Sequence, residues 1–303
     1  MKIKKVRLIG LGALGAMFSQ KIQENFKGDF RVILDSERME RYKKEGIYIN
    51  GKACDFDYMT PEEESEPVDV VIIGTKFSGL NAAIESVKKI VGPNTMIFTL
   101  LNGIISERLL AEAFGKEKVI YCVAQGMDAV REGNQIYYQT MGILRVGEEN
   151  QAPTPRVKAL TDFFDSVGIA YETPTDMHVK MWSKFMFNCG VNQASLVFDT
   201  DYGGLQSEGA SREAMLGAMK EVLAVAKAEN IPLDESEIDY WIPVLNTLRA
   251  EGTPSMKQDA DAKRYSEVML FSGTLRQIAK KHQIAIPINE DFYQHIQELE
   301  ATY

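Results

Sequence analysis

The sequence predicts an α/β fold in which a doubly wound, mostly parallel sheet with an antiparallel extension precedes an all-helical domain. Three observations lead to this prediction. A glycine-rich turn joins an apolar run to a helix-compatible stretch near the N-terminus. Short apolar runs then alternate with helical spacing as far as residue 172, and from residue 176 onward only helical spacing is found. We therefore expect one domain over residues 1–173 and a second over residues 174–303.

The glycine-rich turn follows a strand-like run, residues 6–9, that is apolar apart from one arginine. It has the pattern G-x-G-x-x-G and consists of Gly10, Leu11, Gly12, Ala13, Leu14 and Gly15. In such a turn the first glycine permits a tight bend, the second lets the backbone approach a pyrophosphate, and the third permits close helix–strand packing. The next helix would present its free N–H groups to the phosphates. We expect these six residues to bind a dinucleotide in a Rossmann-type domain; the alternative is a glycine-rich turn without a ligand.

Composition and charge narrow the classes of function. Of the 303 residues 45% are hydrophobic and 25% are charged, which is typical of soluble globular proteins. The net charge of −9 disfavours nucleic acid as a partner, and no apolar run is long enough to span a membrane. Cys54, Cys122 and Cys189 form neither a metal motif nor a disulfide framework. We expect a cytoplasmic protein without a metal, and no targeting segment, because Arg7 and glycines interrupt the apolar N-terminus.

Asp35 stands at the end of the second predicted strand, residues 30–34. Its distance from Gly15 is near the spacing at which an acidic residue accepts hydrogen bonds from the adenosine ribose hydroxyls. The alternative is that Asp35 caps a helix over residues 36–44. We favour the ribose contact.

Further strands and helices complete the first domain. A hairpin centred on Asn50-Gly51 is predicted within residues 47–56. Strands are predicted over 68–74, 95–101, 119–124, 127–130, 136–141, 143–146 and 169–172, and helices over 80–91 and 159–167. Lys76 follows one of these strands and Asn102 another, at the sheet edge where cofactors bind. Lys76 is either a ligand contact or a solvated lysine, and Asn102 either belongs to a turn or presents its amide to the nicotinamide.

Helical segments fill the second domain, and the first of them carries a polar stripe. The segments cover 176–197, 210–229, 235–250, 264–282 and 288–302, with Pro243 inside the third. Lys184, Asn188 and Asn192 are four residues apart, so they line one side of a helix that is otherwise largely apolar. A buried polar stripe needs partners, which either a polar ligand or an internal hydrogen-bond network would supply. Glu267, placed in the fourth helix, is either a surface residue or the partner of a buried lysine.

The chain resembles the ketopantoate reductase (2-dehydropantoate 2-reductase) family over most of its length. The resemblance rests on G-x-G-A-L-G at residues 10–15, Asn102-Gly103, W-x-K-x-x-x-N-x-x-x-N at 182–192, and S-M-x-Q-D at 255–259 followed by Glu267. It implies a Rossmann domain joined to an all-helical domain, with the active site in the cleft between them. It also implies NADPH-dependent reduction of 2-dehydropantoate to (R)-pantoate, a step of pantothenate and coenzyme A biosynthesis.

The resemblance also implies roles for individual residues. Lys184 would be the general acid and Glu267 the carboxylate that orients the substrate hydroxyl. The substrate-binding groups would be Asn102, Asn188, Asn192 and Ser255. This agrees with the chemistry, because hydride addition builds negative charge on a ketone oxygen, which an ammonium group can stabilise and protonate. Amides and a hydroxyl bind carboxylate and hydroxyl groups without titrating themselves.

Asp35 departs from the family, which commonly has an arginine there to pair with the 2′-phosphate of NADP. A carboxylate at this position would repel that phosphate and favours NADH. Two other functions stay open: a related dehydrogenase acting on another 2-keto acid, and a dinucleotide-sensing protein without turnover. The expected partner is thus a small 2-keto acid, and the sequence leaves a homodimer open.

Overall fold

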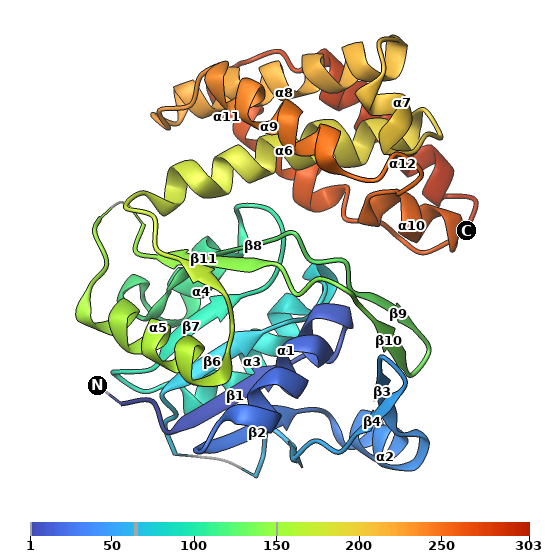
Figure 1. Cartoon of the computed structure of the whole chain (residues 1–303). Helices are drawn as coiled ribbons and strands as arrows, with labels where there is room; N and C mark the ends of the chain where they lie inside the picture. Colours follow the sequence, from blue (N-terminus) through green and yellow to red (C-terminus); the bar gives the residue numbers. More distant parts are fainter. Residues whose placement is uncertain (1, 64–65, 150) are drawn as a thin grey trace. The chain divides into compact units, whose positions relative to one another are not determined.

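The computed structural model describes residues 2–63, 66–149 and 151–303, and its internal contacts divide the chain into two compact units (Figure 1). Unit 1 comprises Met1–Asn102 and Ser106–Met177. Unit 2 comprises Gly103–Ile105 and His178–Tyr303. The predicted domain boundary at residue 173 lies just before the division at Met177.

A five-stranded parallel sheet forms the centre of unit 1, in the order β5-β2-β1-β6-β7. The strands are β1 (Lys5–Ile9), β2 (Asp29–Ile33), β5 (Tyr58–Met59), β6 (Val70–Ile73) and β7 (Met96–Thr99). Every residue of β6 and β7 is buried, as expected for a parallel sheet covered on both faces. The strand order reverses between β1 and β6, and ligands of doubly wound sheets bind at the carboxyl ends of the strands at such a switch point. The predicted fold class is confirmed.

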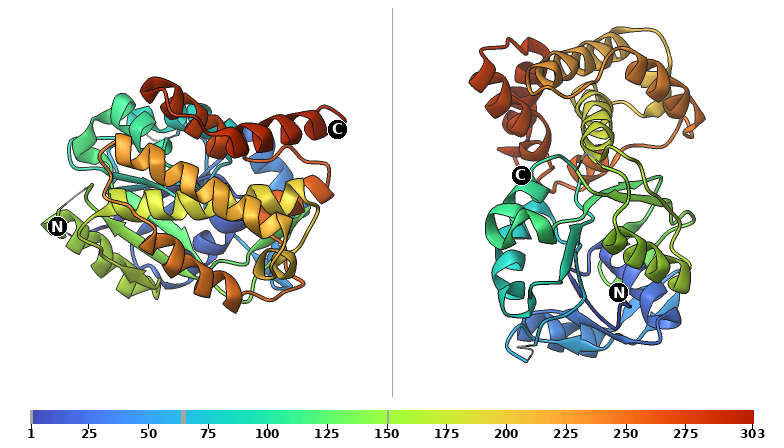
Figure 2. Two further views of the ribbon diagram at one scale, coloured as in Figure 1. Left: turned by 90° about the horizontal axis from the view of Figure 1, so that it is seen from above. Right: turned by 90° about the vertical axis from the view of Figure 1, so that its left-hand side faces the viewer.

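Helices cover both faces of this sheet. In the right-hand view of Figure 2, α1 (Ala13–Asn25) and α5 (Pro155–Val167) lie on one face, and α3 (Leu80–Val87) and α4 (Ser106–Phe114) lie on the other. The remaining helices of unit 1 are α2 (Ser36–Glu45) and three short 3₁₀ turns, η1 (Phe77–Gly79), η2 (Lys88–Ile90) and η3 (Lys116–Lys118). Helix α4 is not among the predicted elements, because a helix of nine residues offers little periodicity.

In place of a purely antiparallel extension, the structure has two small mixed sheets, each of which combines antiparallel pairing with one parallel pair of strands. The first contains β3 (Ile47–Ile49), β4 (Lys52–Cys54), β9 (Val130–Glu132) and β10 (Gln135–Tyr137). The second contains β8 (Tyr121–Gln125), β11 (Ile143–Gly147) and β12 (Tyr171–Glu172). The hairpin at Asn50-Gly51 is confirmed, with β3 antiparallel to β4. The strand expected over 127–130 begins only at Val130, because the Asp128 carboxylate accepts hydrogen bonds from the backbone N–H groups of Gln139 and Thr140.

The described part of unit 2 contains helices and no strand, as predicted. They are α6 (Met177–Val197), α7 (Tyr202–Gln206), α8 (Ala210–Ala228), α9 (Ser236–Thr247), α10 (Ser255–Asp261), a π-helix (Met269–Gly273), α11 (Thr274–His282) and α12 (Pro287–Glu300). Pro243 lies inside α9. The prediction of one helix over 264–282 is wrong in its first part, because helical structure begins only at Met269.

A buried hydrogen-bond network fixes α6 within unit 2. The side-chain amide of Gln193 donates to Asn289 (3.3 Å), and the Ser272 hydroxyl donates to the same oxygen (3.2 Å). Asn289 in turn donates to the carboxylate of Glu221 on α8 (2.8 Å). All three amide or hydroxyl side chains, of Gln193, Ser272 and Asn289, are fully buried and hydrogen-bonded. The network therefore links α6 to the π-helix, α8 and α12.

None of the helices in the described ranges combines the length and the apolar character that crossing a membrane requires. Cys54, Cys122 and Cys189 are free thiols. Among the described residues, no three His, Cys, Asp or Glu side chains gather as a metal site would require.

Candidate functional site

The glycine-rich turn after β1 packs backbone against backbone on the end of β6. Gly10 has a φ of +101°, and a Cβ on it would lie 2.7 Å from backbone atoms of Gly74 and Thr75. A Cβ on Gly15 would overlap the carbonyl oxygen of Gly10. Neither position can hold a side chain without moving the backbone, so both glycines are required by the packing of unit 1 itself.

Gly12 differs from its two neighbours in the motif. A Cβ on Gly12 would lie 3.6 Å from the carbonyl oxygen of Gly74, an ordinary van der Waals distance. Gly12 is exposed and is the N-cap residue of α1, without a side-chain cap. The first N–H groups of α1 have no acceptor within the helix. The free N–H groups can bind a phosphate at the start of α1. The packing of the protein does not require a glycine at position 12, so the absence of a side chain there fits the close approach of that phosphate.

Asp35 caps α2. Its carboxylate accepts the backbone N–H of Arg38 at 2.7 Å and lies 3.3 Å from the Arg38 Nε. The structure thus shows the capping arrangement that the sequence offered as the alternative. The Asp35 side chain is 57% exposed and stands at the end of β2, so its oxygens are also accessible to a ligand.

The two other polar residues predicted at the sheet edge follow β6 and β7. Lys76 is exposed and precedes η1, and Asn102 is half-buried beyond the end of β7. The chain turns at Gly103, whose φ is +89°, where a Cβ would lie 3.4 Å from the side chain of Leu270. Asn102 therefore belongs to a turn.

The polar stripe of α6 continues into a hydrogen-bonded chain within unit 2. Asn188 and Asn192 are buried, and Lys184 is half-buried. The Asn192 amide donates to Asn188 Oδ1 at 3.1 Å, and the Ser255 hydroxyl at the start of α10 donates to Asn192 Oδ1 at 3.4 Å. The structure therefore brings together three of the residues that the family resemblance proposes for substrate binding.

One side-chain amide in this hydrogen-bonded series has a donor group without an acceptor. Asn188 Nδ2 is buried and has no hydrogen-bond partner among the described residues. A buried donor without an acceptor costs on the order of 1–3 kcal/mol and is rare in native proteins. The nearby amides of Gln193 and Asn289 do have acceptors. Asn188 thus fits a site where a ligand oxygen supplies the missing acceptor.

Glu267 lies outside any helix, which corrects its predicted position. It is half-buried in the turn before the π-helix, and its backbone carbonyl accepts the N–H groups of Leu270 (2.8 Å) and Phe271 (3.3 Å). Its neighbour Val268 is buried. Short π-helical segments are often found at functional sites.

Two charged residues in unit 1 escaped the sequence analysis. Glu107 on α4 is buried and accepts hydrogen bonds from the hydroxyls of Thr99 (3.2 Å) and Ser106 (3.3 Å). Arg131 on β9 donates to the backbone carbonyl of Leu11 in the glycine-rich turn. Neither belongs to a local motif, because Glu107 is on an unpredicted helix and Arg131 is far from Leu11 in sequence.

Glu107 is expected to make stability depend on pH. Desolvation raises the pKa of Glu107 from 4.5 to about 7, so the folded protein favours the neutral carboxyl group. Its contribution to stability is therefore full at low pH and is lost as the pH rises through about 7. When the pH rises from about 5 to about 8, the free energy of unfolding of the wild type should fall by about 3 kcal/mol. The decrease should be smaller in Glu107→Gln. Urea unfolding of both proteins across this range checks this, and equal pH dependence would contradict it.

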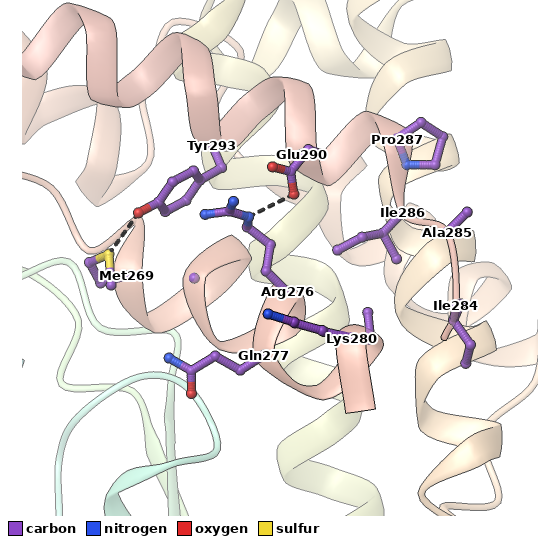
Figure 3. Close-up of a pocket in the computed structure, with 12 residues that line it drawn as sticks. Met269, Arg276, Gln277, Lys280, Ile284, Ala285, Ile286, Pro287, Glu290 and Tyr293 are labelled. Carbon is purple, nitrogen blue, oxygen red and sulfur yellow. Dashed lines mark hydrogen bonds and ion pairs between the residues drawn. The ribbon is translucent and has the colours of Figure 1, made fainter. Parts of the chain in front are cut away.

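A separate cavity of about 540 Å³ lies in unit 2 beside the π-helix, α11 and α12 (Figure 3). Arg276 crosses it, stacks over the ring of Tyr293 at 4.0 Å, and pairs with Glu290 at 2.6 Å. A carboxylate ligand would have to compete with that ion pair. None of the predicted site residues lines this cavity.

The chain matches known proteins over nearly its whole length. Family models described as "Ketopantoate reductase PanE/ApbA" and "Ketopantoate reductase PanE/ApbA C terminal" match residues 6–151 and 176–300. An uncharacterized oxidoreductase, YkpB, from Bacillus subtilis (strain 168) is 26% identical, with 98% of this chain and 99% of the relative covered. A 2-dehydropantoate 2-reductase from Aquifex aeolicus (strain VF5) is 24% identical, with 95% and 94% covered.

A solved structure shares the fold. It is the ternary structure of D-mandelate dehydrogenase with NADH and anilino(oxo)acetate, which has a TM-score of 0.87 and 20% identity to this chain. The match covers 98% of this chain and 99% of that one.

Proposed function

Because this chain belongs to the ketopantoate reductase PanE/ApbA family of oxidoreductases, we propose that it reduces a small 2-keto acid with NAD(P)H. We propose 2-dehydropantoate as the substrate and (R)-pantoate as the product, a step towards pantothenate and coenzyme A. The observation that carries the proposal is the hydrogen-bonded series formed by the buried Asn188 and Asn192 and the exposed Ser255, with an Asn188 amide that lacks an acceptor.

The dinucleotide is assigned to the domain of residues 1–173. Residues 10–15 would hold its pyrophosphate, because the N–H groups at the start of α1 are uncapped by a side chain and Gly12 leaves room for close approach. Lys76 and Asn102 would contact it further along the same sheet edge. When bound, the reduced nicotinamide supplies the hydride that is added to the keto carbon.

The substrate groups are assigned mainly to the domain of residues 174–303. Lys184 lies one helical turn from Asn188 on α6, so its ammonium group can stabilise and protonate the ketone oxygen as negative charge builds there. Asn188 would donate its unsatisfied amide hydrogen to a substrate oxygen. Asn102, Asn192 and Ser255 would complete the binding of the substrate. Glu267 would accept a hydrogen bond from the substrate hydroxyl.

A substrate panel tests this proposal. Oxidation of NADH and NADPH is followed with 2-dehydropantoate, with 2-keto acids that lack its hydroxyl group, and with aryl 2-keto acids. We expect the highest kcat/KM for 2-dehydropantoate. Turnover of another 2-keto acid alone would replace the substrate but keep the reaction class. Dinucleotide binding without turnover of any 2-keto acid would favour a sensing protein.

We expect the protein to prefer NADH over NADPH because of Asp35. Its carboxylate can accept hydrogen bonds from the ribose hydroxyls and would repel a 2′-phosphate. Asp35→Asn keeps an oxygen that can cap α2 but removes the charge, so it should lower the preference for NADH without unfolding the helix. Asp35→Arg should move the preference further towards NADPH.

The ratio of kcat/KM for the two cofactors measures this preference in all three proteins. A wild-type enzyme that favours NADPH by about tenfold or more, or about 1.4 kcal/mol, would contradict the prediction.

A further inference from the structure

Arg131 reaches from the β9–β10 hairpin to the glycine-rich turn. Its guanidinium Nη1 donates to the carbonyl oxygen of Leu11, its Nε donates to the carbonyl of Gly133 (2.7 Å), and its Nη2 lies 3.3 Å from the Tyr42 hydroxyl. The guanidinium also lies over the Tyr42 ring, 5.3 Å from the centroid. Three different elements of unit 1 thus hold the half-buried Arg131 beside the start of α1.

The charge at this position is not balanced by the protein. No carboxylate among the described residues forms an ion pair with Arg131, although most arginines of unit 1 have one, such as Arg7 with Asp29. Leu11 directly precedes Gly12, the N-cap residue of α1, and the partial positive charge at a helix N-terminus disfavours a nearby cation. Two positive groups therefore lie close together, and no described carboxylate is within ion-pair distance of Arg131.

The guanidinium also keeps hydrogen-bonding capacity. It has five N–H groups in a planar fork, of which its contacts with Gly133, Leu11 and Tyr42 occupy three. The remaining donors suit a phosphate, which an arginine binds by charge as well as by hydrogen bonds.

We infer that Arg131 binds a phosphate group of the dinucleotide, together with the N-terminus of α1. The inference rests on the proposed function, since it needs a dinucleotide at the glycine-rich turn. It adds a phosphate-binding residue from a hairpin outside the G-x-G-x-x-G motif. A bound phosphate would neutralise the guanidinium and the helix N-terminus at once.

Binding measurements on four proteins test the inference. Isothermal titration calorimetry gives Kd for NADH and for NADPH with wild type, Arg131→Gln, Arg131→Lys and Arg41→Gln. The last is the matched control, because the Arg41 guanidinium also lies over Tyr42, at 5.2 Å, but has no hydrogen bond to the glycine-rich turn among the described residues. Thermal unfolding without ligand shows whether each variant is folded.

Arg131→Gln should weaken binding about tenfold to a hundredfold, as expected for loss of a charged hydrogen-bonding group. Arg131→Lys should restore part of the affinity because it keeps the charge, and Arg41→Gln should bind like the wild type. A loss shared by NADH and NADPH assigns Arg131 to the pyrophosphate, and a loss confined to NADPH assigns it to the 2′-phosphate.

Two results would overturn the inference while leaving the proposed function intact. The first is a folded Arg131→Gln with wild-type Kd values. The second is an equal loss in Arg131→Gln and Arg131→Lys with lowered unfolding temperatures, which would make Arg131 a tether between hairpin and turn. A wild-type protein that binds neither dinucleotide would refute the proposed function and the inference together.

Discussion

Lys184→Ala is expected to lower kcat by about a hundredfold or more, the scale for losing a group that transfers a proton in the transition state. The ammonium group that this substitution removes lies on the polar stripe of α6, one turn from the buried amide of Asn188. Lys184→Arg keeps a positive charge but donates a proton poorly because an arginine stays protonated, so it should restore little of the rate. The pH profile of kcat in the wild type should contain an ionisation that both variants lose.

The control for this experiment is Lys220→Ala. Lys220 is an exposed lysine on α8, 3.8 Å from Glu235, and such surface pairs contribute little to stability. It should keep wild-type kcat. If Lys184→Ala is folded and turns over at a near-normal rate, the ammonium group is structural and the proposed acid is wrong.

Gly15→Ala should damage the fold of unit 1, whereas Gly12→Ala should damage dinucleotide binding alone. The added Cβ at Gly15 meets the carbonyl oxygen of Gly10, and backbone atoms cannot move aside as a flexible side chain can. We expect a loss of stability beyond the roughly 1–3 kcal/mol typical of overpacking. At Gly12 the same methyl group has ordinary contacts within the protein, so the free energy of unfolding should change by about 1 kcal/mol or less.

The two alanine variants are separated by measuring unfolding free energies without ligand and Kd for the dinucleotide. Gly12→Ala should bind the dinucleotide about tenfold or more weakly, because its methyl group would occupy the space of the pyrophosphate. Unchanged binding by Gly12→Ala would show that no phosphate approaches this part of the turn. Stable, folded Gly15→Ala would show that the backbone packing between α1 and the end of β1 is less tight than its geometry indicates.

Local sequence patterns predicted the features that depend on neighbours along the chain. The glycine-rich turn follows a strand and opens α1, the Asn50-Gly51 hairpin has the predicted pairing, and Asn188 and Asn192 share one side of α6. In each case the spacing of residue types matches the period of a strand, a helix or a tight turn. The fold class followed from the order of these elements.

The tertiary structure alone decided the features that depend on residues distant in sequence. Glu267 was expected inside a helix, but its segment becomes helical only at Met269, and no local pattern distinguishes the turn that precedes a π-helix. The unsatisfied amide of Asn188 appears only once every neighbouring acceptor has been placed. Arg131 meets Leu11 because β10 packs against α1, which brings the β9–β10 hairpin beside the glycine-rich turn.

Short-range periodicity therefore predicted many of the longer helices and strands and placed Lys184, Asn188 and Asn192 on one helix, but it missed α4 and misplaced Glu267. The tertiary structure decided which polar groups have partners and which do not. That balance is set by burial and by contacts across long stretches of chain, and these depend on the packed fold as a whole.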